Sequence, residues 1–270
     1  MIQTVKKKPP RLSPAETAGI GAVFLALLLL PFDARIAVVP LVLFFLLCMV
    51  APFLPGFGFF LPVISRGRTD RPVVALTFDD GPNPNSTPFL LDLLDRHQAA
   101  ATFFVNGRTA RRHPDLIREI VARGHTIGNH SYSHDNFVMF KRPRTLIREI
   151  EATQRVLRRH GVVPLLFRPP VGVTSPRLCN AMEATGMVVV NFSRRAADMG
   201  NRRVHRLAER ILKRLRPGDI IMLHDIPPAT EALCEEWRRQ VEAVMAGIRQ
   251  RGLVVVPLEQ LIDRPVMKIV

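Results

Sequence analysis

Cysteine and the large aromatic residues are scarce in this 270-residue sequence, which contains three Cys, one Trp and one Tyr. Three cysteines cannot form a disulfide framework, and none of Cys48, Cys179 and Cys234 belongs to a CxxC pair. Surfaces that bind nucleic acids combine basic residues with exposed aromatic rings that stack on bases. With so few aromatic residues of that kind, we expect no nucleic-acid partner.

Internal repeats and periodic glycine or proline are also missing, which excludes solenoid and collagen-like architectures. Hydrophobic residues make up 47% of the chain, enough to bury a core, so global disorder is excluded as well. Acidic residues are in the minority, because 38 Lys and Arg stand against 23 Asp and Glu. The resulting formal net charge of +15 favours an anionic partner, such as a phospholipid surface or a negatively charged substrate.

Two uncharged apolar runs, residues 18–32 and 36–61, dominate the first quarter of the chain. As helices, the first would span about 22 Å and a 20-residue piece of the second about 30 Å, the thickness of a bilayer's hydrocarbon core. We therefore predict a basic tail over residues 1–17 and a membrane anchor over residues 18–62. Several prolines then break the pattern and lead into a linker over residues 63–71.

Basic residues flank both ends of this anchor: Lys6–Lys8 and Arg11 precede it, and Arg66, Arg68 and Arg71 follow it. Since positively charged flanks stay on the cytoplasmic side, we favour a two-helix transmembrane hairpin with the rest of the chain in the cytoplasm. Three alternatives stay open. They are a single crossing with the other run lying in the interface, a cleaved signal peptide, and a buried helical hairpin of a soluble protein.

After residue 70, short β-rich runs alternate with amphipathic helical stretches. The predicted strands cover residues 73–78, 101–105, 126–128, 165–168, 188–192, 219–223 and 253–257. Such alternation is typical of parallel βα units, and a closed or nearly closed barrel is the economical arrangement at this length. We assign residues 72–263 to this α/β domain and residues 264–270 to a C-terminal tail.

Polar residues gather where the predicted strands end, and in a βα barrel those ends share one face. The first strand ends in Asp79 and Asp80, and the third is followed by His130 and His134. On a helical turn the two histidines would point to one side, and with Asp80 they would form a facial ligand set like that of catalytic zinc sites. Asp79, pointing the other way in an extended backbone, could serve as a general base.

Four motifs, FDDGP, HSYSH, FRPP and LHD, occur in an order and spacing that resemble the polysaccharide deacetylase family, the NodB-homology domain of carbohydrate esterase family four. The resemblance covers about residues 70–262. It implies a distorted seven-stranded (β/α) barrel that hydrolyses N-acetyl groups on amino sugars with a divalent metal, usually Zn²⁺. It further implies a bacterial protein of the inner membrane.

The resemblance also implies roles for individual residues. Asp79 would be the general base, held ionised by Arg168, and His224 the general acid. The backbone N–H of Val171 would stabilise the oxyanion, and Leu223 would help to wall the acyl pocket. The metal ligands would be Asp80, His130 and His134.

One motif departs from the family pattern, in which Asp-x-x-Asp-Trp is common and its first Asp buttresses the acid histidine. Aligned on Asp198, this chain has Arg195 in place of that first Asp and Met199 in place of the Trp. A neighbouring cation would lower the pKa of His224. We expect either that another acid, such as Asp198, orients His224, or that Arg195 has turned toward the substrate.

Three functions follow as hypotheses. The first is a metal-dependent N-deacylase that acts on a lipid-linked or otherwise anionic amino sugar at the membrane. The second is the same chemistry on a periplasmic polymer such as peptidoglycan or an exported polysaccharide. The third is a non-catalytic, membrane-bound sugar-binding protein, which would not need a general acid and a general base.

Overall fold

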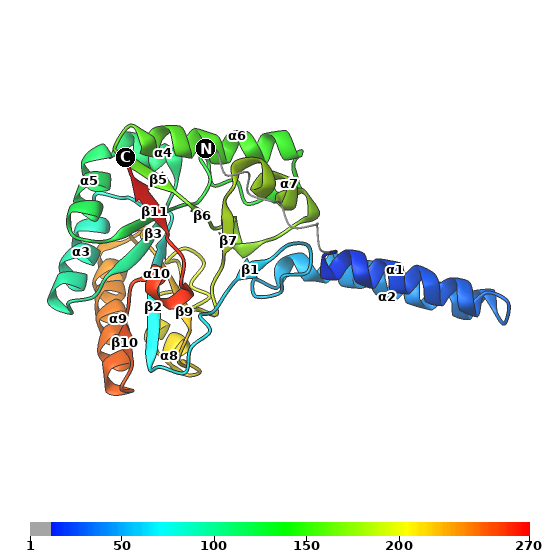
Figure 1. The fold of residues 1–270 in the computed structure, drawn as a ribbon. Helices are drawn as coiled ribbons and strands as arrows, with labels where there is room; N and C mark the ends of the chain where they lie inside the picture. Colours follow the sequence, from blue (N-terminus) through cyan, green and yellow to red (C-terminus); the bar gives the residue numbers. More distant parts are fainter. Residues whose placement is uncertain (1–11) are drawn as a thin grey trace.

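The computed structural model describes residues 12–270, and its parts are an elongated helical hairpin and an α/β domain (Figure 1). Most of the predicted basic tail, including Lys6–Lys8 and Arg11, lies outside the described residues. Helices α1 (Pro14–Leu29) and α2 (Ala34–Val50) run side by side and form the hairpin. Ser13 begins α1 with a capping box to Glu16, and Asp33 caps α2 by accepting a hydrogen bond from the N–H of Arg35.

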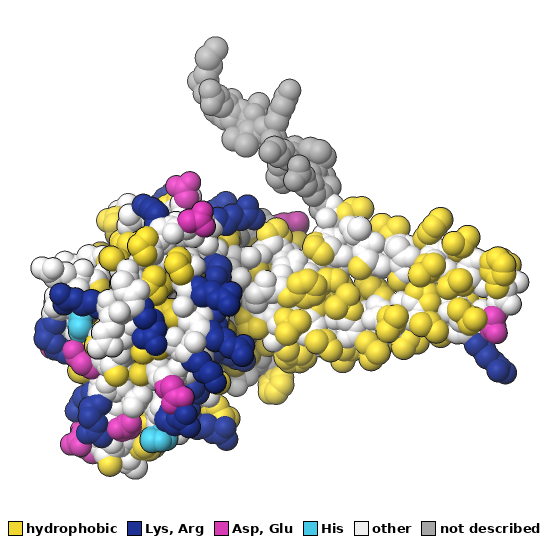
Figure 2. All heavy atoms as spheres, turned by 90° about the horizontal axis from the view of Figure 1, so that it is seen from below, with side chains coloured by type: hydrophobic (Ala, Val, Ile, Leu, Met, Phe, Trp, Pro, Cys, Tyr) yellow, Lys and Arg dark blue, Asp and Glu magenta, His cyan; other side chains and the backbone are white. Residues whose placement is uncertain are grey.

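The hairpin exposes many apolar side chains, and Figure 2 shows them along the face seen there. Phe24 and Phe45 are 68% and 62% exposed, and in the two helices only Ala26 and Ala37 are buried. The helix from Ala34 to Phe53 is long and apolar enough to cross a membrane, whereas α1 is shorter. The observed hairpin agrees with the predicted helix pair, and its insertion into a membrane stays a prediction.

The α/β domain is built on a curled sheet of nine parallel strands in the order β1-β7-β6-β4-β3-β2-β9-β8, with β10 beside the start of β2. The strands are β1 (Val63–Ile64), β2 (Val73–Asp79), β3 (Ala101–Val105), β4 (Thr126–Asn129), β6 (Leu166–Phe167), β7 (Val188–Val190), β8 (Arg194–Arg195), β9 (Ile220–His224) and β10 (Val254–Val255). Each of the seven predicted strands is present. The parallel curled sheet confirms the predicted distorted (β/α) barrel.

Helices cover the outside of the sheet and are amphipathic as the sequence predicts (Figure 1). They bury leucine, isoleucine and phenylalanine side chains against the strands, and Trp237, on the longest of these helices, packs into the core. These helices are α3 (Thr87–Arg96), α4 (Gly107–Arg112), α5 (Pro114–Ala122), α6 (Pro143–Arg158), α7 (Pro176–Thr185), α8 (Leu207–Leu212), α9 (Glu231–Gln250) and α10 (Leu258–Ile262).

Two segments outside the predicted α/β domain contribute strands to it. The predicted linker supplies β1, at one end of the sheet. Shortly after β1, the N–H of Gly67 donates a hydrogen bond of 2.8 Å to the carbonyl of Gly218. The linker therefore bridges the two ends of the sheet. The predicted C-terminal tail supplies β11 (Met267–Ile269), which pairs antiparallel with β5 (Val162–Pro164). Both strands are two or three residues long, too short for a sequence pattern to reveal them.

The base of the hairpin belongs to the core of the domain. Phe59, Phe60 and Leu61 are 2%, 8% and 3% exposed and pack with residues of β6, β7 and α7. The short 3-10 helix Ala51–Phe53 continues α2 into this region, and the carbonyl of Pro52 accepts a hydrogen bond from the N–H of Thr174. The hairpin is therefore joined to the α/β domain by packed structure.

Candidate active site

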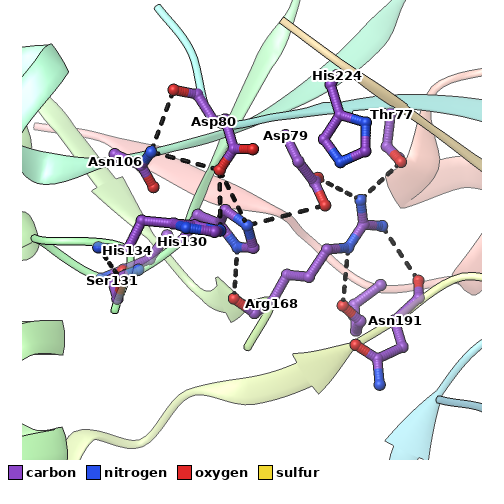
Figure 3. Close-up of polar contacts among 12 residues, drawn as sticks. Thr77, Asp79, Asp80, Asn106, His130, Ser131, His134, Arg168, Asn191 and His224 are labelled. Carbon is purple, nitrogen blue, oxygen red and sulfur yellow. Dashed lines mark hydrogen bonds and ion pairs between the residues drawn. The ribbon is translucent and has the colours of Figure 1, made fainter. Parts of the chain in front are cut away.

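A cleft of about 810 Å³ opens at the carboxyl ends of the central strands. It is lined by side chains from β2, β9 and the loops after β4, β6, β7 and β8, which include Asp79, Asp80, His130, His134, Val171, Arg195, Asp198 and His224. Parallel strands bring their carboxyl ends to one edge, so residues far apart in sequence meet here. Figure 3 shows the centre of this arrangement.

Asp79 is fixed at the end of β2 by a buried arginine. Nη1 of Arg168 donates to Oδ1 of Asp79 at 2.6 Å and to Oγ1 of Thr77 at 2.8 Å, and Arg168 has no exposed surface (Figure 3). The guanidinium also donates to the carbonyls of Val190 and Asn191. A buried charge needs such full pairing, and the contact with Arg168, which was predicted, fixes one carboxylate oxygen of Asp79.

Asp80 faces the same cleft as Asp79, which corrects the expectation that the two point in opposite directions. Its backbone φ is 75°, so the chain turns at Asp80 instead of continuing as a strand. Nδ2 of Asn106 donates to the carbonyl of Asp80 at 3.1 Å and to Oδ1 at 3.4 Å. Next in the chain, Gly81 is required because a Cβ there would lie 2.1 Å from Oδ2 of Asp225.

His130 and His134 meet Asp80 without the helical turn that the sequence predicted. Ser131 and His134 have φ values of 67° and 54°, and this irregular loop brings the two imidazole centroids to 4.9 Å. Nε2 of His134 lies 3.0 Å and Nε2 of His130 3.6 Å from Oδ1 of Asp80. The loop is anchored by Glu149 of α6, whose carboxylate accepts hydrogen bonds from the N–H groups of Tyr132 and Ser133.

The chemistry of these three side chains fits a divalent metal ion. One ligand atom from each of Asp80, His130 and His134 can be chosen so that all lie within 4.8 Å of one another. Nδ1 of His130 lies 2.7 Å from the carbonyl oxygen of Arg168, so it carries the proton and leaves Nε2 free as a ligand. Burial tends to raise the pKa of Asp80, but the two imidazoles hold it well below its usual range, so the carboxylate is anionic.

His224 is buttressed by Asp198. Nδ1 of His224 lies 2.9 Å from Oδ2 of Asp198, a buried carboxylate. Burial tends to lower the pKa of His224, but the hydrogen bond and charge of Asp198 outweigh it and raise the pKa to about 9. The prediction that Arg195 lowers the pKa of His224 is therefore wrong. Among the alternatives left open by the sequence, the structure selects Asp198 as the orienting acid.

The strand register places Asp79 and His224 side by side. Asp79 of β2 is paired with His224 of β9, so the two residues are direct neighbours across the sheet. Strand alternation then corrects the assignment of Leu223, which is 1% exposed and belongs to the core beneath the helices. Met222 lines the cleft instead. Val171 does line it, with an unusual φ of 53° and 48% exposure.

Arg194 and Arg195 separate because they are adjacent in the short strand β8. Nε of Arg194 pairs with Oδ2 of Asp219 at 2.9 Å, outside the cleft, whereas Arg195 is exposed and lines the cleft. The guanidinium carbon of Arg195 lies 5.6 Å from the ring centre of Phe192. The expectation that Arg195 faces the substrate side thus agrees with the structure, while the same expectation for Arg194 is wrong.

Several supporting residues were not predicted from the sequence. They are Thr77, Asn106, Glu149, Asn191 and Asp225, and each touches a residue of one of the four motifs. Asp225 is buried and accepts hydrogen bonds from the hydroxyls of Ser86 and Thr87, both at 2.6 Å. Burial raises its pKa to about 7 despite these bonds. In the sequence, the place of Asp225 in the LHD motif was the only sign that this carboxyl group belongs near the site.

The Asp79–Arg168 pair, the His224–Asp198 pair and the Asp-His-His cluster lie at one face of the barrel, as in a hydrolase-type site, and comparisons with known proteins agree. The family model described as polysaccharide deacetylase matches residues 66–190. A chitooligosaccharide deacetylase of Bradyrhizobium sp. (strain ANU 289) is 34% identical over 197 residues, covering 70% of this chain and 90% of the relative. The chain therefore belongs to the polysaccharide deacetylase family, as the four motifs indicated.

Two further similarities are informative. A peptidoglycan-N-acetylglucosamine deacetylase of Bacillus cereus (strain ATCC 14579) is 34% identical over 155 residues, covering 57% of this chain and 72% of the relative. The solved structure of the Bc1960 peptidoglycan N-acetylglucosamine deacetylase superposes with a TM-score of 0.68 at 28% identity, covering 76% of this chain and 94% of that chain. The family model thus covers the first part of the α/β domain, and the similarity in fold extends over 76% of the chain.

Proposed function

We propose that this protein is a metal-dependent amidohydrolase that removes an N-acetyl group from an amino sugar, with N-acetylglucosamine as the first candidate. One observation carries the proposal. Asp79, fixed by Arg168, and His224, fixed by Asp198, are register neighbours that face the same cleft as the Asp-His-His cluster. The relatives named as deacetylases of chitooligosaccharides and of peptidoglycan support the substrate class.

In this mechanism Asp79 is the general base. It accepts a proton from the attacking water, and the ion pair with Arg168 orients the carboxylate for that transfer. His224 is the general acid that donates a proton to the leaving amine. Its raised pKa of about 9 keeps the imidazole protonated at neutral pH. The backbone N–H of Val171, at the wall of the cleft, is the donor proposed for the oxyanion.

Asp80, His130 and His134 are the residues that would hold the metal ion, for which Zn²⁺ is our first choice because two imidazoles and one carboxylate suit it. A bound divalent cation would polarise the acyl carbonyl and lower the pKa of a coordinated water. Asn106 and Glu149 hold the carboxylate and the histidine loop in place for this role.

The test separates the base from the ligands. Asp79→Asn should abolish deacetylation of an N-acetylglucosamine oligomer, by roughly 100- to 10,000-fold, because an amide cannot accept the water proton. Metal bound to Asp79→Asn, measured by elemental analysis, should match the wild type. Asp80→Ala and His134→Ala should lose both the metal and the activity. A wild-type protein that holds no divalent ion and hydrolyses the oligomer in the presence of a chelator would overturn the proposal.

We further propose that the hairpin spans the bacterial inner membrane and leaves the catalytic domain in the cytoplasm. The exposed apolar surface of α1 and α2 supports insertion, and Arg66, Arg68 and Arg71 follow the second helix. A reporter fused after Val270 should then be active only in the cytoplasm. A reporter active only in the periplasm would favour the second candidate function, deacetylation of peptidoglycan or an exported polysaccharide, which the peptidoglycan-acting relatives support.

A further inference from the structure

Two arginines that form no ion pair within the described part of the chain line the cleft beside His224. Arg195 of β8 is paired in register with Met222, two residues before His224, and Arg202 lies in the turn that follows Asp198. Both arginines line the cleft together with Asp80 and His224. The substrate side of the active site therefore carries two guanidinium groups in addition to the groups that perform the chemistry.

The surrounding acids are already engaged. Asp198 is bonded to His224, and Asp219 is paired with Arg194 and with Arg66. Within residues 12–270, no ion pair involves Arg195 or Arg202. Arg195 contacts the ring of Phe192 instead, a contact that supports a guanidinium without neutralising it. Two uncompensated cations at a cleft favour an anionic ligand over a neutral one.

The cleft wall beside Arg195 is built on the base of the hairpin. Phe192, which supports Arg195, lies against Gly172, since a Cβ on Gly172 would be 3.2 Å from the Phe192 ring and 3.3 Å from Pro55. Nδ2 of Asn191 donates to the carbonyls of both Pro55 and Gly172, at 2.8 Å and 3.1 Å. Figure 2 shows Lys and Arg side chains gathered on the domain along the side next to the hairpin. Arg195 is thus linked through Phe192 and Gly172 to Pro55 at the base of the hairpin.

We propose that Arg195 and Arg202 bind a phosphate group carried by the amino-sugar substrate. This inference rests on the proposed deacetylase function and adds the substrate class. The forked donors of arginine suit the anionic oxygens that phosphate monoesters and phosphodiesters share. The phosphate could belong to a soluble sugar phosphate or could link the sugar to a membrane lipid, and the experiment distinguishes these sources.

The experiment compares three substrates with the full chain in detergent and in vesicles. They are a neutral N-acetylglucosamine oligomer, N-acetylglucosamine 1-phosphate, and N-acetylglucosamine linked through phosphate to a prenyl chain in phospholipid vesicles. For Arg195→Ala, kcat/KM on the phosphate substrates should fall roughly 10- to 100-fold more than kcat/KM on the neutral oligomer, the range for hydrogen bonds to a charged group. Arg195→Lys should lose less, because it keeps the charge but lacks the fork.

Arg249→Ala is the matched control, because Arg249 is an exposed arginine at the end of α9 and its loss changes the net charge equally. It should leave all three rates unchanged. A wild-type preference for the vesicle-borne substrate over the soluble phosphate identifies the lipid-linked source, and equal use of both identifies the phosphate alone. Equal loss on neutral and phosphate substrates in Arg195→Ala would overturn the inference. A wild type inactive on all three would instead reject the deacetylase function.

Discussion

The hairpin and the catalytic domain of this protein are held together by different means. The hairpin exposes large apolar side chains such as Phe24 and Phe45 and contains only two charged residues, Asp33 and Arg35, between residues 17 and 65. The catalytic domain buries its apolar side chains and also buries charged groups, among them Arg168 and Asp225. This difference shows that an apolar composition is enough to specify the hairpin. The catalytic domain also requires a specific partner for each buried charged group.

The boundary between these regions does not fall where the apolar run ends. Ala51 and the cluster of Phe59, Phe60 and Leu61 are buried in the catalytic domain, although their sequence resembles that of the hairpin. In the same segment, the carbonyl of Pro55 accepts a hydrogen bond from Asn191, which lies beside the cleft wall. The last part of the predicted membrane anchor is therefore core structure of the domain.

The largest expected effect comes from cutting the chain on either side of this boundary. A chain that begins at residue 50 should fold, because it keeps the buried base of the hairpin. A chain that begins at residue 63 loses, among other buried groups, the three large side chains of Phe59, Phe60 and Leu61, each worth about 1.5–3 kcal/mol, which together approach the stability of a typical domain. Unfolding in urea, followed by the fluorescence of Trp237, reports only on the catalytic domain. Equal midpoints for the two chains would place the boundary elsewhere.

Single phenylalanines sharpen the comparison at an intermediate scale. Phe103 is fully buried and stacks on Phe78 with 5.2 Å between ring centres, so Phe103→Ala should lower the free energy of unfolding by about 3–5 kcal/mol. Phe45 is 62% exposed on α2, so Phe45→Ala should change it by less than about 0.5 kcal/mol. Both variants are measured as the full chain in detergent. A large loss in Phe45→Ala would mean that the hairpin contributes to domain stability.

The smallest expected effect concerns the pH profile. In Asp198→Asn the imidazole of His224 loses the partner that raises its pKa to about 9, so the alkaline limb of the kcat/KM profile should move to lower pH. The rate at neutral pH should fall about 100-fold, the lower range for a misoriented general acid. The free energy of unfolding should also depend on His224, because its pKa is raised in the folded protein. The resulting stability is fully present below pH 6.5 and is lost as the pH rises through about 9.

Asp263→Asn is the control for this profile, because Asp263 is exposed at the end of α10 and its substitution removes the same charge. Its alkaline limb should coincide with that of the wild type. If Asp198→Asn also leaves the limb in place, then Asp198 does not set the protonation of His224, and the buttress must be sought among other groups.

The sequence by itself determined the order of the seven predicted strands, the apolar helix pair, and the motif residues that meet in the cleft. These features are local: a strand of Val and Ile flanked by turn residues, or a motif such as FDDGP, can be recognised without knowing its neighbours in space. Asp79, Asp80, His130 and His134 all lie in the cleft, since parallel strands bring their ends to one edge.

Only the tertiary structure decided which partner each of these residues has. Whether Met222 or Leu223 faces the cleft depends on the register of β9, and the direction of Asp80 depends on a single positive φ. Asp198 became the buttress of His224, and Arg195 was left facing the substrate side, because of the turns that follow β8. Such outcomes depend on contacts between distant segments and on single backbone angles, and neither leaves a periodic pattern in the sequence.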